Sequence, residues 1–362
     1  MLNLYLVCGP AEERGIHFLS KLGVLPWTVS VDMFRALYVS PAMTLGGELE
    51  VPHQQDDLVH SKMLDIVEQR LKIGETTLVE GDFRDEHVQR YEKLAARWGY
   101  SVNVINLKAR SASTLSNADF CRAVNGDLED FTGKYREIVF IGDVHGCAAP
   151  LRRLLGKHFE SDKLFVFVGD LFDRGPDNGD VFKIMMSLLD KPNVRLICGN
   201  HERHILSWLN GRDTPGEFKN NTLPQLFRHG FDRNKAKFIM DKAELLMQFS
   251  FKGANFQVSH GALADVVTRP SLFPGYQCWR GVGKRTDRID ESFELKAPAD
   301  WYQVHGHSNA HNRVVAAGQR SFNLESSVEF GGKLSALAFD GVRFKDISVK
   351  SASGKTKKKR EA

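Results

Sequence analysis

Side chains that can bind metal ions or move protons follow five apolar segments in the second half of the chain. The segments, each ending in a glycine-flanked polar cluster, are REIVFIGDVHG, KLFVFVGDLFDRG, NVRLICGNHE, NFQVSHG and WYQVHGHS. The side chains at their ends are Asp143, His145, Asp170, Asn200, His260 and His307. Because ligands gather at the carboxyl ends of strands in α/β sheets, we expect these side chains to converge.

The converging donors mix carboxylate, imidazole and amide groups. Paired divalent ions roughly 3.5–4 Å apart lower the pKa of a shared water and stabilise an in-line displacement at phosphorus. A carboxylate bridges two cations well, and Asp170 is placed to do so. Mixed nitrogen and oxygen ligation suits Mn, Fe, Zn or Ni better than an all-oxygen Ca site. We therefore expect two divalent metal ions, manganese foremost, with iron, zinc or nickel as alternatives.

A lone Asp-x-His is ordinarily a surface turn, but five ordered clusters, each behind a strand, are a specific signal. The segments GDVHG, GDLFDRG, GNHE, SHG and GH, over about residues 136–348, resemble the calcineurin-like metallophosphoesterases. Within that family they resemble the branch of phosphoprotein phosphatases and bacterial diadenosine tetraphosphatases. The resemblance implies an α/β metallophosphatase domain.

The resemblance also implies a role for each matching residue. Asp143, His145 and Asp170 would hold one metal ion, and Asp170, Asn200, His260 and His307 the other. His201 would be the general acid, with Asp173 orienting it and raising its pKa. Arg174 would grip phosphate oxygens with its planar fork, Arg280 would be a second phosphate-binding arginine, and Asn200 would also face the phosphate.

Shorter apolar runs in the first half alternate with helical patterns. LNLYLVCG, WTVSVD, TTLVEGD and SVNVINL are typical of strands, and Val88, Tyr91, Leu94, Ala95 and Trp98 fall at helical spacing. The alternation predicts a doubly wound parallel α/β domain over about residues 1–112. The polar residues 111–133 predict a lid or linker, and residues 203–250 predict a mostly helical insertion. LSALAFDGVRFKDISV is typical of a β-hairpin that turns at Asp340-Gly341.

The first 125 residues resemble the P-loop kinase domain of polynucleotide kinase-phosphatases, through Asp32-x-x-Arg35 after WTVSV and LVEGD before a helix. A phosphate loop reads Gly-x-x-x-x-Gly-Lys-Ser/Thr. From Gly9 this chain places Gly15 at the lysine position and Ile16 at the hydroxyl position. We therefore predict that the domain does not transfer phosphate from ATP and that Asp32 and Arg35 are vestigial. It would serve as a scaffold, recognise a nucleic-acid end or nucleotide, or retain altered catalysis.

The formal charge of +4 divides unevenly along the chain. Residues 350–362 hold five Lys, one Arg and one Glu, a net +5, which leaves residues 1–349 at −1. The main body is thus neutral, and the basic tail, expected to be disordered, is either solubilising or a salt-sensitive tether for nucleic acid. We expect domains at 1–125 and 136–349, a linker at 126–135 and the tail at 350–362.

The five cysteines are odd in number and form no Cys-x-x-Cys pair, which fits a reducing compartment. The chain start lacks a basic signal-peptide region, and no apolar run approaches the ~18–20 residues of a membrane helix. We therefore expect a cytoplasmic protein with no membrane partner. Composition leaves its oligomeric state open.

Several functions agree with these patterns. The order of the domains favours a phosphatase acting on nucleic-acid or nucleotide phosphates, such as 3′-phosphate or 2′,3′-cyclic phosphate ends. The motifs are shared by Ser/Thr protein phosphatases and by dinucleoside-polyphosphate hydrolases, which are the alternatives. A binding module with an idle metal site is disfavoured because the predicted ligand set is complete.

Overall fold

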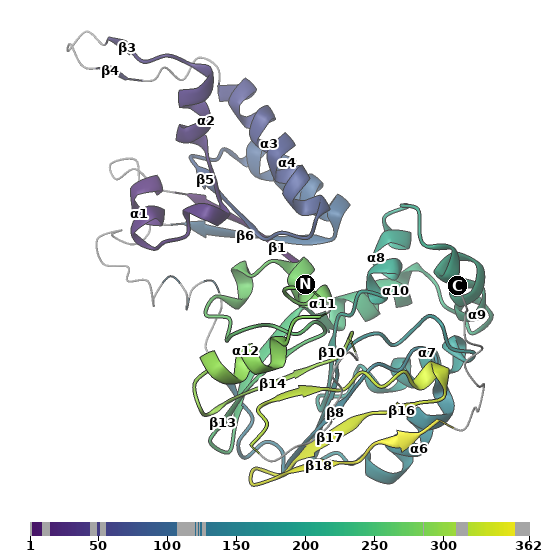
Figure 1. Cartoon of the computed structure of the whole chain (residues 1–362). Coiled ribbons are helices and arrows are strands. Elements are labelled where there is room, and N and C mark those ends of the chain that lie inside the picture. The colour runs from purple at the N-terminus through teal and green to yellow at the C-terminus, as the bar shows by residue number, and fades with distance from the viewer. Residues whose placement is uncertain are drawn as a thin grey trace. The chain divides into compact units, whose positions relative to one another are not determined.

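The computed structural model describes residues 2–8, 15–43, 49–50, 56–106, 120, 122, 124, 128–284, 286–308 and 318–351. The chain divides into two compact units (Figure 1): unit 1 is Met1–Asp127 with Arg269–Tyr276, and unit 2 is Leu128–Thr268 with Gln277–Ala362. The linker predicted at residues 126–135 stays a prediction. No sequence signal indicated that residues 269–276 group with the first unit. Among the helices described, none combines the length and apolarity needed to span a bilayer.

Unit 1 is built on a parallel sheet of four strands in the order β2-β5-β1-β6. The strands are β1 (Leu2–Cys8), β2 (Thr28–Ser30), β5 (Thr77–Gly81) and β6 (Tyr100–Asn106). The helices are α1 (Gly15–Lys21), η1 (Leu25–Trp27), α2 (Val31–Tyr38), α3 (Asp56–Lys72) and α4 (Asp85–Trp98), and β3 (Ala42–Met43) pairs with β4 (Leu49–Glu50). The parallel α/β arrangement expected here is confirmed, whereas the kinase-like resemblance stays a prediction.

The strand predicted over WTVSVD is shorter than expected. It ends at Ser30, whose side chain accepts a hydrogen bond from the backbone N–H of Met33 and caps α2. Asp32 and Arg35 therefore lie in the first turns of a helix. Residues 9–14 of the predicted degenerate phosphate loop lie outside the described residues, as do residues 111–119, 121, 123 and 125–127 of the segment predicted as a lid or linker.

Unit 2 is a sandwich of two sheets. The first, ordered β11-β10-β9-β8-β17-β18, contains β8 (Glu137–Ile141), β9 (Lys163–Phe167), β10 (Val194–Ile197), β11 (Ala243–Glu244), β17 (Ala336–Phe339) and β18 (Phe344–Asp346). The second, ordered β15-β14-β13-β12-β7, contains β7 (Glu129–Asp130), β12 (Leu246–Phe251), β13 (Ala254–Ser259), β14 (Trp301–His305) and β15 (Ser321–Asn323). A small sheet pairs β16 (Lys333–Leu334) with β19 (Val349–Lys350).

The core of unit 2 lies between its two sheets. Phe140, Val166 and Leu337 from the first sheet pack with Phe249, Phe256 and Val304 from the second. This apolar layer holds the two sheets in fixed register, because close-packed interiors tolerate little relative shift. The carboxyl ends of strands from both sheets are thereby positioned rigidly.

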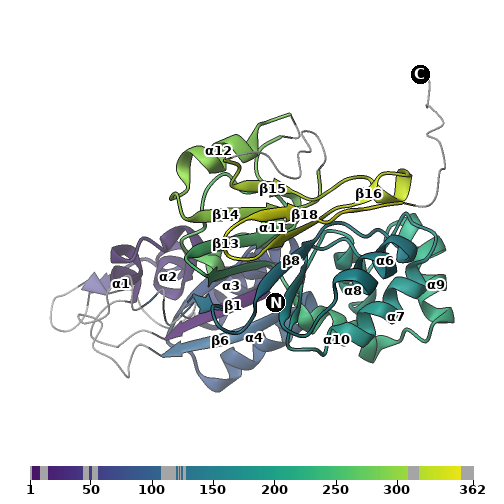
Figure 2. The same cartoon turned by 90° about the horizontal axis from the view of Figure 1, so that it is seen from below.

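Helices surround this sandwich: α6 (Ala148–His158), α7 (Asn178–Leu188), α8 (Glu202–Leu209), α9 (Leu223–Arg228), α10 (Arg233–Lys242), α11 (Gly275–Arg280) and α12 (Ile289–Lys296). Single turns of unit 2 lie at η4 (Phe218–Thr222, π-helical) and η6 (Val328–Phe330), whereas η5 (Pro270–Leu272) belongs to unit 1. Figure 2 shows α6 to α10 gathered at one side of unit 2 and α12 at the other.

Two sequence predictions for unit 2 are confirmed with differences in extent. Residues 203–250 are mostly helical, but the helices end at Lys242, and β11 and most of β12 follow. The C-terminal hairpin is confirmed, but Phe339 pairs with Phe344, so its connection is longer than the Asp340-Gly341 turn. Lys350 belongs to β19, and residues 352–362 of the predicted tail lie outside the described residues.

Candidate metal centre

The predicted ligands gather at the carboxyl ends of strands from both sheets of unit 2. Asp143, Asp170 and Asn200 follow β8, β9 and β10 in the first sheet. His260 and His307 follow β13 and β14 in the second. The site therefore straddles the sandwich, whereas the sequence patterns did not separate its strands into two sheets.

Backbone carbonyls orient two of the histidines. His145 and His260 donate from Nδ1 to the carbonyls of Phe172 (3.1 Å) and Val168 (2.9 Å). Each bond fixes the ring and turns Nε2 toward the carboxylate of Asp170. Ligating histidines in metalloproteins are held in this way by a partner on the other ring nitrogen.

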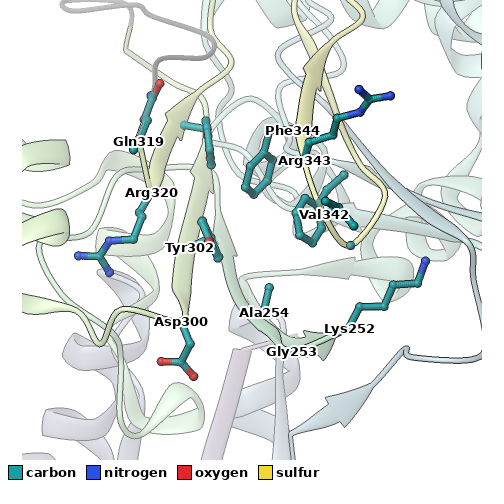
Figure 3. Close-up of a pocket in the computed structure, with 14 residues that line it drawn as sticks. Lys252, Gly253, Ala254, Asp300, Tyr302, Gln319, Arg320, Val342, Arg343 and Phe344 are labelled. Carbon is teal, nitrogen blue, oxygen red and sulfur yellow. The ribbon is translucent and has the colours of Figure 1, made fainter.

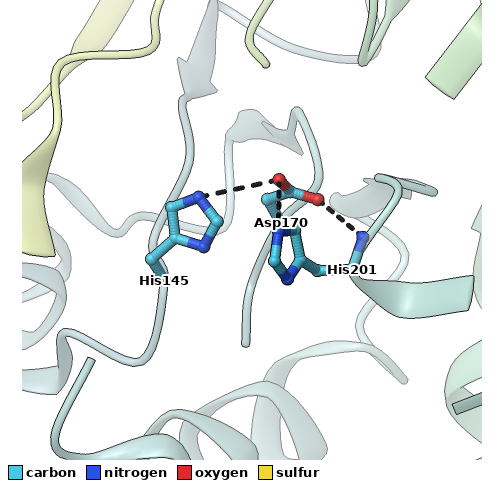
Figure 4. A group of neighbouring side chains, drawn as sticks. All are labelled: His145, Asp170 and His201. Atoms are coloured by element: carbon cyan, nitrogen blue, oxygen red, sulfur yellow. Dashed lines mark hydrogen bonds and ion pairs between the residues drawn. The ribbon is translucent and has the colours of Figure 1, made fainter. Parts of the chain in front are cut away.

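Asp170 lies at the centre of the cluster. Its Oδ2 is 3.6 Å from Nε2 of His145 and 3.2 Å from Nε2 of His260. Its Oδ1 accepts a hydrogen bond from the backbone N–H of His201 at 3.0 Å. Figure 4 shows His145 and His201 on either side of this carboxylate. Asp170 thus lies between donors predicted for both metal ions, as a bridging carboxylate must.

Asn200 and two histidines lie together at the second predicted metal position. Asn200 Oδ1 lies 3.1 Å from His260 Nε2 and 2.8 Å from His307 Nδ1. Burial and the nearby His260 lower the pKa of His307 to about 4, so its imidazole is neutral at neutral pH, as metal coordination requires. At the other position, Asp143 Oδ2 lies 3.9 Å from His145 Nε2.

These residues fit a pair of divalent ions. The donor atoms of Asp170, His260 and His307 lie within 4.8 Å of one another, as do those of His145, Asp170 and His201. Although burial raises the pKa of Asp170, the surrounding imidazoles hold it well below its usual value, so the carboxylate is ionised. Carboxylates beside imidazoles are a donor set for Mn, Fe, Zn or Ni.

The backbone around the cluster is unusually constrained. His145, Asp170, Asp173, Arg174 and His307 all have positive φ, between 42° and 72°. Such conformations are costly for residues with a Cβ and concentrate at functional sites. A Cβ on Gly306 would lie 2.0 Å from Asp143 Oδ1, and one on Gly199 would lie 2.2 Å from Asp170 Oδ1. The flanking glycines of the motifs therefore make room for the carboxylates.

Asp173 binds the predicted general acid. Its Oδ2 accepts hydrogen bonds from Nδ1 of His201 (2.6 Å) and Nδ1 of His204 (2.7 Å), and Thr222 donates to Oδ1. Burial opposes protonation of His201, but the bond to Asp173 and the charge of Asp170 raise its pKa above the ordinary value. The predicted pairing of Asp173 with His201 is thus present, and His204 and Thr222 complete it.

The two predicted phosphate-binding arginines line one pocket of about 560 Å³, together with His307 and Lys284. The Arg174 guanidinium lies 3.0 Å from Nε2 of His145 and 3.1 Å from Nε2 of His201, whereas Arg280 is exposed. Cations beside the cluster suit an anionic ligand that carries phosphate. The catalytic and binding roles assigned to these residues stay predictions.

Three glutamates at the site carried no predicted role. Glu202 is fully buried, and its carboxylate accepts backbone hydrogen bonds from Gly199, Asp170 and Leu171, each at 2.8 Å. Glu325 lies with Asp143 and His145 in a third group of close donors. Glu329 binds Arg174 at 3.2 Å. The sequence could have indicated Glu202 as a site residue because it follows Asn200 and His201. Glu329 comes from a loop that is distant in sequence, so no motif pointed to it.

That loop, SSVEFGG, turns at Ser327, which adopts a left-handed conformation at φ 52°. Its backbone N–H donates to Glu325 Oε1 at 2.7 Å. A local hydrogen bond therefore helps to hold Ser327 in a conformation that side chains rarely adopt.

Other polar residues of unit 2 lie away from the cluster or are buried. Burial raises the pKa of Cys147 and Cys198 to about 12, so neither thiol is a nucleophile at neutral pH. His305 bonds to Asp290 at 2.7 Å, and the Trp279 ring packs under Arg203.

A second pocket, of about 500 Å³, contains no predicted site residue (Figure 3). Its aromatic wall includes Tyr302 and Phe344. Lys252 Nζ donates to the carbonyls of Arg136 and Asp340, both at 2.8 Å, and Arg320 donates to carbonyls at the end of α12. Backbone carbonyls bind both of these side chains, which indicates that Lys252 and Arg320 have a structural role.

In unit 1, Asp32 and Arg35 form an ion pair at 2.6 Å, and Arg35 also binds Asp56 at 2.9 Å. Ser30 donates to the buried Glu80 at 2.6 Å. These contacts satisfy the charges locally. They do not test the vestigial role predicted for Asp32 and Arg35.

Comparison with known proteins gives a family and several relatives. The family model for calcineurin-like phosphoesterases matches residues 136–341. A bis(5′-nucleosyl)-tetraphosphatase PrpE (asymmetrical) of Halalkalibacterium halodurans is 24% identical over 228 residues, 57% of this chain and 92% of its own length. The enzyme of the same name from Oceanobacillus iheyensis is 26% identical over 233 residues, 59% of this chain and 92% of its own length.

A shorter match is closer in sequence. A symmetrical bis(5′-nucleosyl)-tetraphosphatase of Legionella pneumophila is 42% identical over 88 residues, 24% of this chain and 31% of its own length. Among solved structures, a putative diadenosine tetraphosphatase covers 63% of this chain and 99% of its own, with 19% identity and a TM-score of 0.42. A TM-score below 0.5 supports no further argument.

Proposed function

This chain belongs to the calcineurin-like phosphoesterases, and from that premise we propose that it is a two-metal phosphohydrolase of nucleotide phosphates. The family uses divalent metals in a binuclear site, its members hydrolyse phosphoester bonds, and the Asp and His clusters of unit 2 fit that chemistry. The observation that carries the proposal is Asp170, whose carboxylate lies between the two groups of donors.

Side chains of this chain form both metal positions, which share Asp170. Asp143, His145 and Asp170 hold one ion, and Asp170, Asn200, His260 and His307 hold the other. When bound, the two ions lower the pKa of a shared water and stabilise negative charge on phosphoryl oxygens. We propose manganese as the resident metal, with iron, zinc or nickel as the alternatives that the mixed donors also accept.

His201 supplies the proton that the leaving oxygen needs. Asp173 holds the imidazole by Nδ1 at 2.6 Å and, with Asp170, favours the protonated form. Nε2 is then the atom from which the proton leaves. The oriented ring avoids the loss of proton-transfer efficiency that a freely rotating imidazole would suffer.

Arg174 and Arg280 bind the substrate phosphates. The two guanidinium groups line the same pocket as His307, and a planar fork matches two phosphate oxygens at once. Asn200 also contributes its side-chain amide to the phosphate. A third cation, Lys284, lines the pocket as well and suits a substrate with more than one phosphate.

Two substrate classes follow from different observations. The names of the relatives, bis(5′-nucleosyl)-tetraphosphatases, favour a dinucleoside polyphosphate. The kinase-like resemblance of the first 125 residues favours nucleic-acid ends carrying 3′-phosphate or 2′,3′-cyclic phosphate, with the kinase activity lost. In the second case unit 1 recognises the nucleic-acid end, and the basic tail adds sequence-independent affinity.

A substrate panel tests the proposal. The purified full chain with Mn²⁺ is given diadenosine tetraphosphate, nucleotide 3′-, 5′- and cyclic phosphates, a 3′-phosphorylated oligonucleotide and a phosphopeptide, and kcat/KM is compared. We expect a nucleotide substrate to be hydrolysed fastest. Faster hydrolysis of the phosphopeptide would identify a protein phosphatase and contradict the proposal, and no hydrolysis of any substrate would contradict phosphatase activity altogether.

A further inference from the structure

Glu329 is a charged residue of the site that no part of the proposed chemistry uses. Its side chain is only 1% exposed, and it lines the pocket that contains Arg174 and His307. Oε1 accepts a hydrogen bond from Arg174 Nη1 at 3.2 Å. Oε2 is buried and accepts no hydrogen bond from the described residues. Because an ionised carboxylate is costly to bury alone, Arg174 is the group that compensates it.

The loop that carries Glu329 is fixed before any ligand arrives. Ser327 and Gly331, on either side of η6, both have left-handed backbones, and the N–H of Gly332 donates to the carbonyl of Ser327 at 3.0 Å. A Cβ on Gly332 would lie 1.9 Å from the carbonyl oxygen of Ser326. The carboxylate therefore has a defined position.

Arg174 needs such an anchor. Its side chain is 42% exposed, and its backbone has positive φ at 65°. A long, partly exposed arginine loses rotamer freedom when it is held against a ligand. This entropy cost weakens binding unless the side chain is already restricted in the free protein. The Glu329 carboxylate restricts the guanidinium at the edge of the metal cluster.

We propose that Glu329 is a positioning residue, which holds Arg174 in the orientation that receives the substrate phosphate. The proposal rests on the proposed phosphatase function. Glu329 acts through Arg174 and does not contact the reacting atoms. Its effect must therefore disappear when Arg174 is absent, which a double-mutant cycle measures directly.

The test compares wild type with Glu329→Ala, Glu329→Gln, Arg174→Ala and the double variant Arg174→Ala/Glu329→Ala, all as full chains loaded with Mn²⁺. Two quantities are measured: the dissociation constant of inorganic phosphate by calorimetry, and kcat/KM on the best substrate of the panel. Metal content and thermal midpoint are recorded for each variant. Glu244→Ala, which breaks the Arg195–Glu244 ion pair (2.7 Å) elsewhere in unit 2, is the matched control.

We expect Glu329→Ala to weaken phosphate binding and to lower kcat/KM by about 10- to 100-fold, the usual effect of removing a residue that orients a functional group. In the Arg174→Ala background the same change has less than about a twofold effect. Glu329→Gln keeps an acceptor oxygen and retains most of the affinity, and Glu244→Ala behaves as wild type.

Equal losses from Glu329→Ala in the two backgrounds would overturn the proposal, as would wild-type phosphate affinity in Glu329→Ala. If Glu329→Ala does not fold, Glu329→Gln in both backgrounds carries the same comparison, with a smaller loss that again requires Arg174. If wild type neither binds phosphate nor hydrolyses any substrate, the proposed function itself fails, which is a distinct result.

Discussion

Both units place charged side chains near the carboxyl ends of parallel strands, but they arrange the charges differently. In unit 1 the Arg35 guanidinium lies between two carboxylates, 2.6 Å from Asp32 and 2.9 Å from Asp56. In unit 2 the ion-pair partners of Asp170 among the described residues are histidines. A permanent cation pairs with the carboxylates of the first group, whereas the second group offers imidazole and carboxylate donors that fit metal ions. The two clusters thus differ in the identity of the cationic partner.

The largest expected effect comes from removing the shared carboxylate of unit 2. Asp170→Asn keeps the shape but loses the charge that two cations require, so kcat should fall by more than about 10³-fold, beyond the loss from one electrostatic donor in other enzymes. Metal content by mass spectrometry should fall as well. Asp56→Asn, the matched change in unit 1, should leave both quantities unchanged. Full turnover by Asp170→Asn would discredit the proposed metal site.

His201→Gln should have the next largest effect. Removing a general acid costs about 10²–10⁴-fold when the leaving oxygen is basic, and much less when it is a good leaving group. The measurement is kcat on a nucleotide ester against kcat on p-nitrophenyl phosphate. An equal loss on both substrates would show that His201 does not deliver the proton.

The folded state of unit 1 should lose stability in acid. His60 and His87 are buried and stacked at 3.8 Å, and burial, followed by the charge of His87, lowers the pKa of His60 to about 4 from 6.5. Between these values the unfolded chain binds a proton that the folded unit does not. Stability is therefore complete above pH 6.5 and decreases as the pH falls towards 4.

Limited proteolysis at pH 7 and pH 5, with the cleavage sites mapped by mass spectrometry, measures this loss of stability for each unit separately. His60→Gln should reduce the change in unit 1 between the two pH values. An unchanged pH response in that variant would assign the acid sensitivity to another group.

The smallest effect is expected for Asp32→Ala. Its side chain is 48% exposed, and exposed ion pairs contribute about 0.2–1 kcal/mol. Phosphatase turnover and thermal stability should be nearly unchanged, and ATP should bind neither protein in calorimetry. ATP binding by wild type that is lost in Asp32→Ala would restore a nucleotide site to unit 1 and remove the contrast between the units.

The sequence allowed most of the metal cluster to be predicted because its ligands are tied to local patterns. Asp143, Asp170 and Asn200 each follow a buried apolar run that could only be a strand, and parallel strands end at one edge. The separation into two sheets was not predictable, since it depends on which strands pair. Glu329 was missed for the same kind of reason: its contact with Arg174 joins two loops that no periodicity connects.

One strand could have been recognised. Residues 246–250 end the stretch predicted to be mostly helical, yet Met247 and Phe249, with Phe251 just beyond it, alternate with partly exposed residues, as a half-buried strand requires. By contrast, β15 (Ser321–Asn323) is too short for any period to be recognised.

The position of the ligands across two sheets has a mechanical consequence. Asp170 and Asn200 extend from one layer of the sandwich, and His260 and His307 from the other. Any ion that they share ties the two layers together at one end, in addition to the apolar packing between them. Because binding to the folded state alone adds to stability, unfolding of unit 2 should depend on the concentration of free metal. The catalytic ions would then also act as a reversible cross-link of the fold.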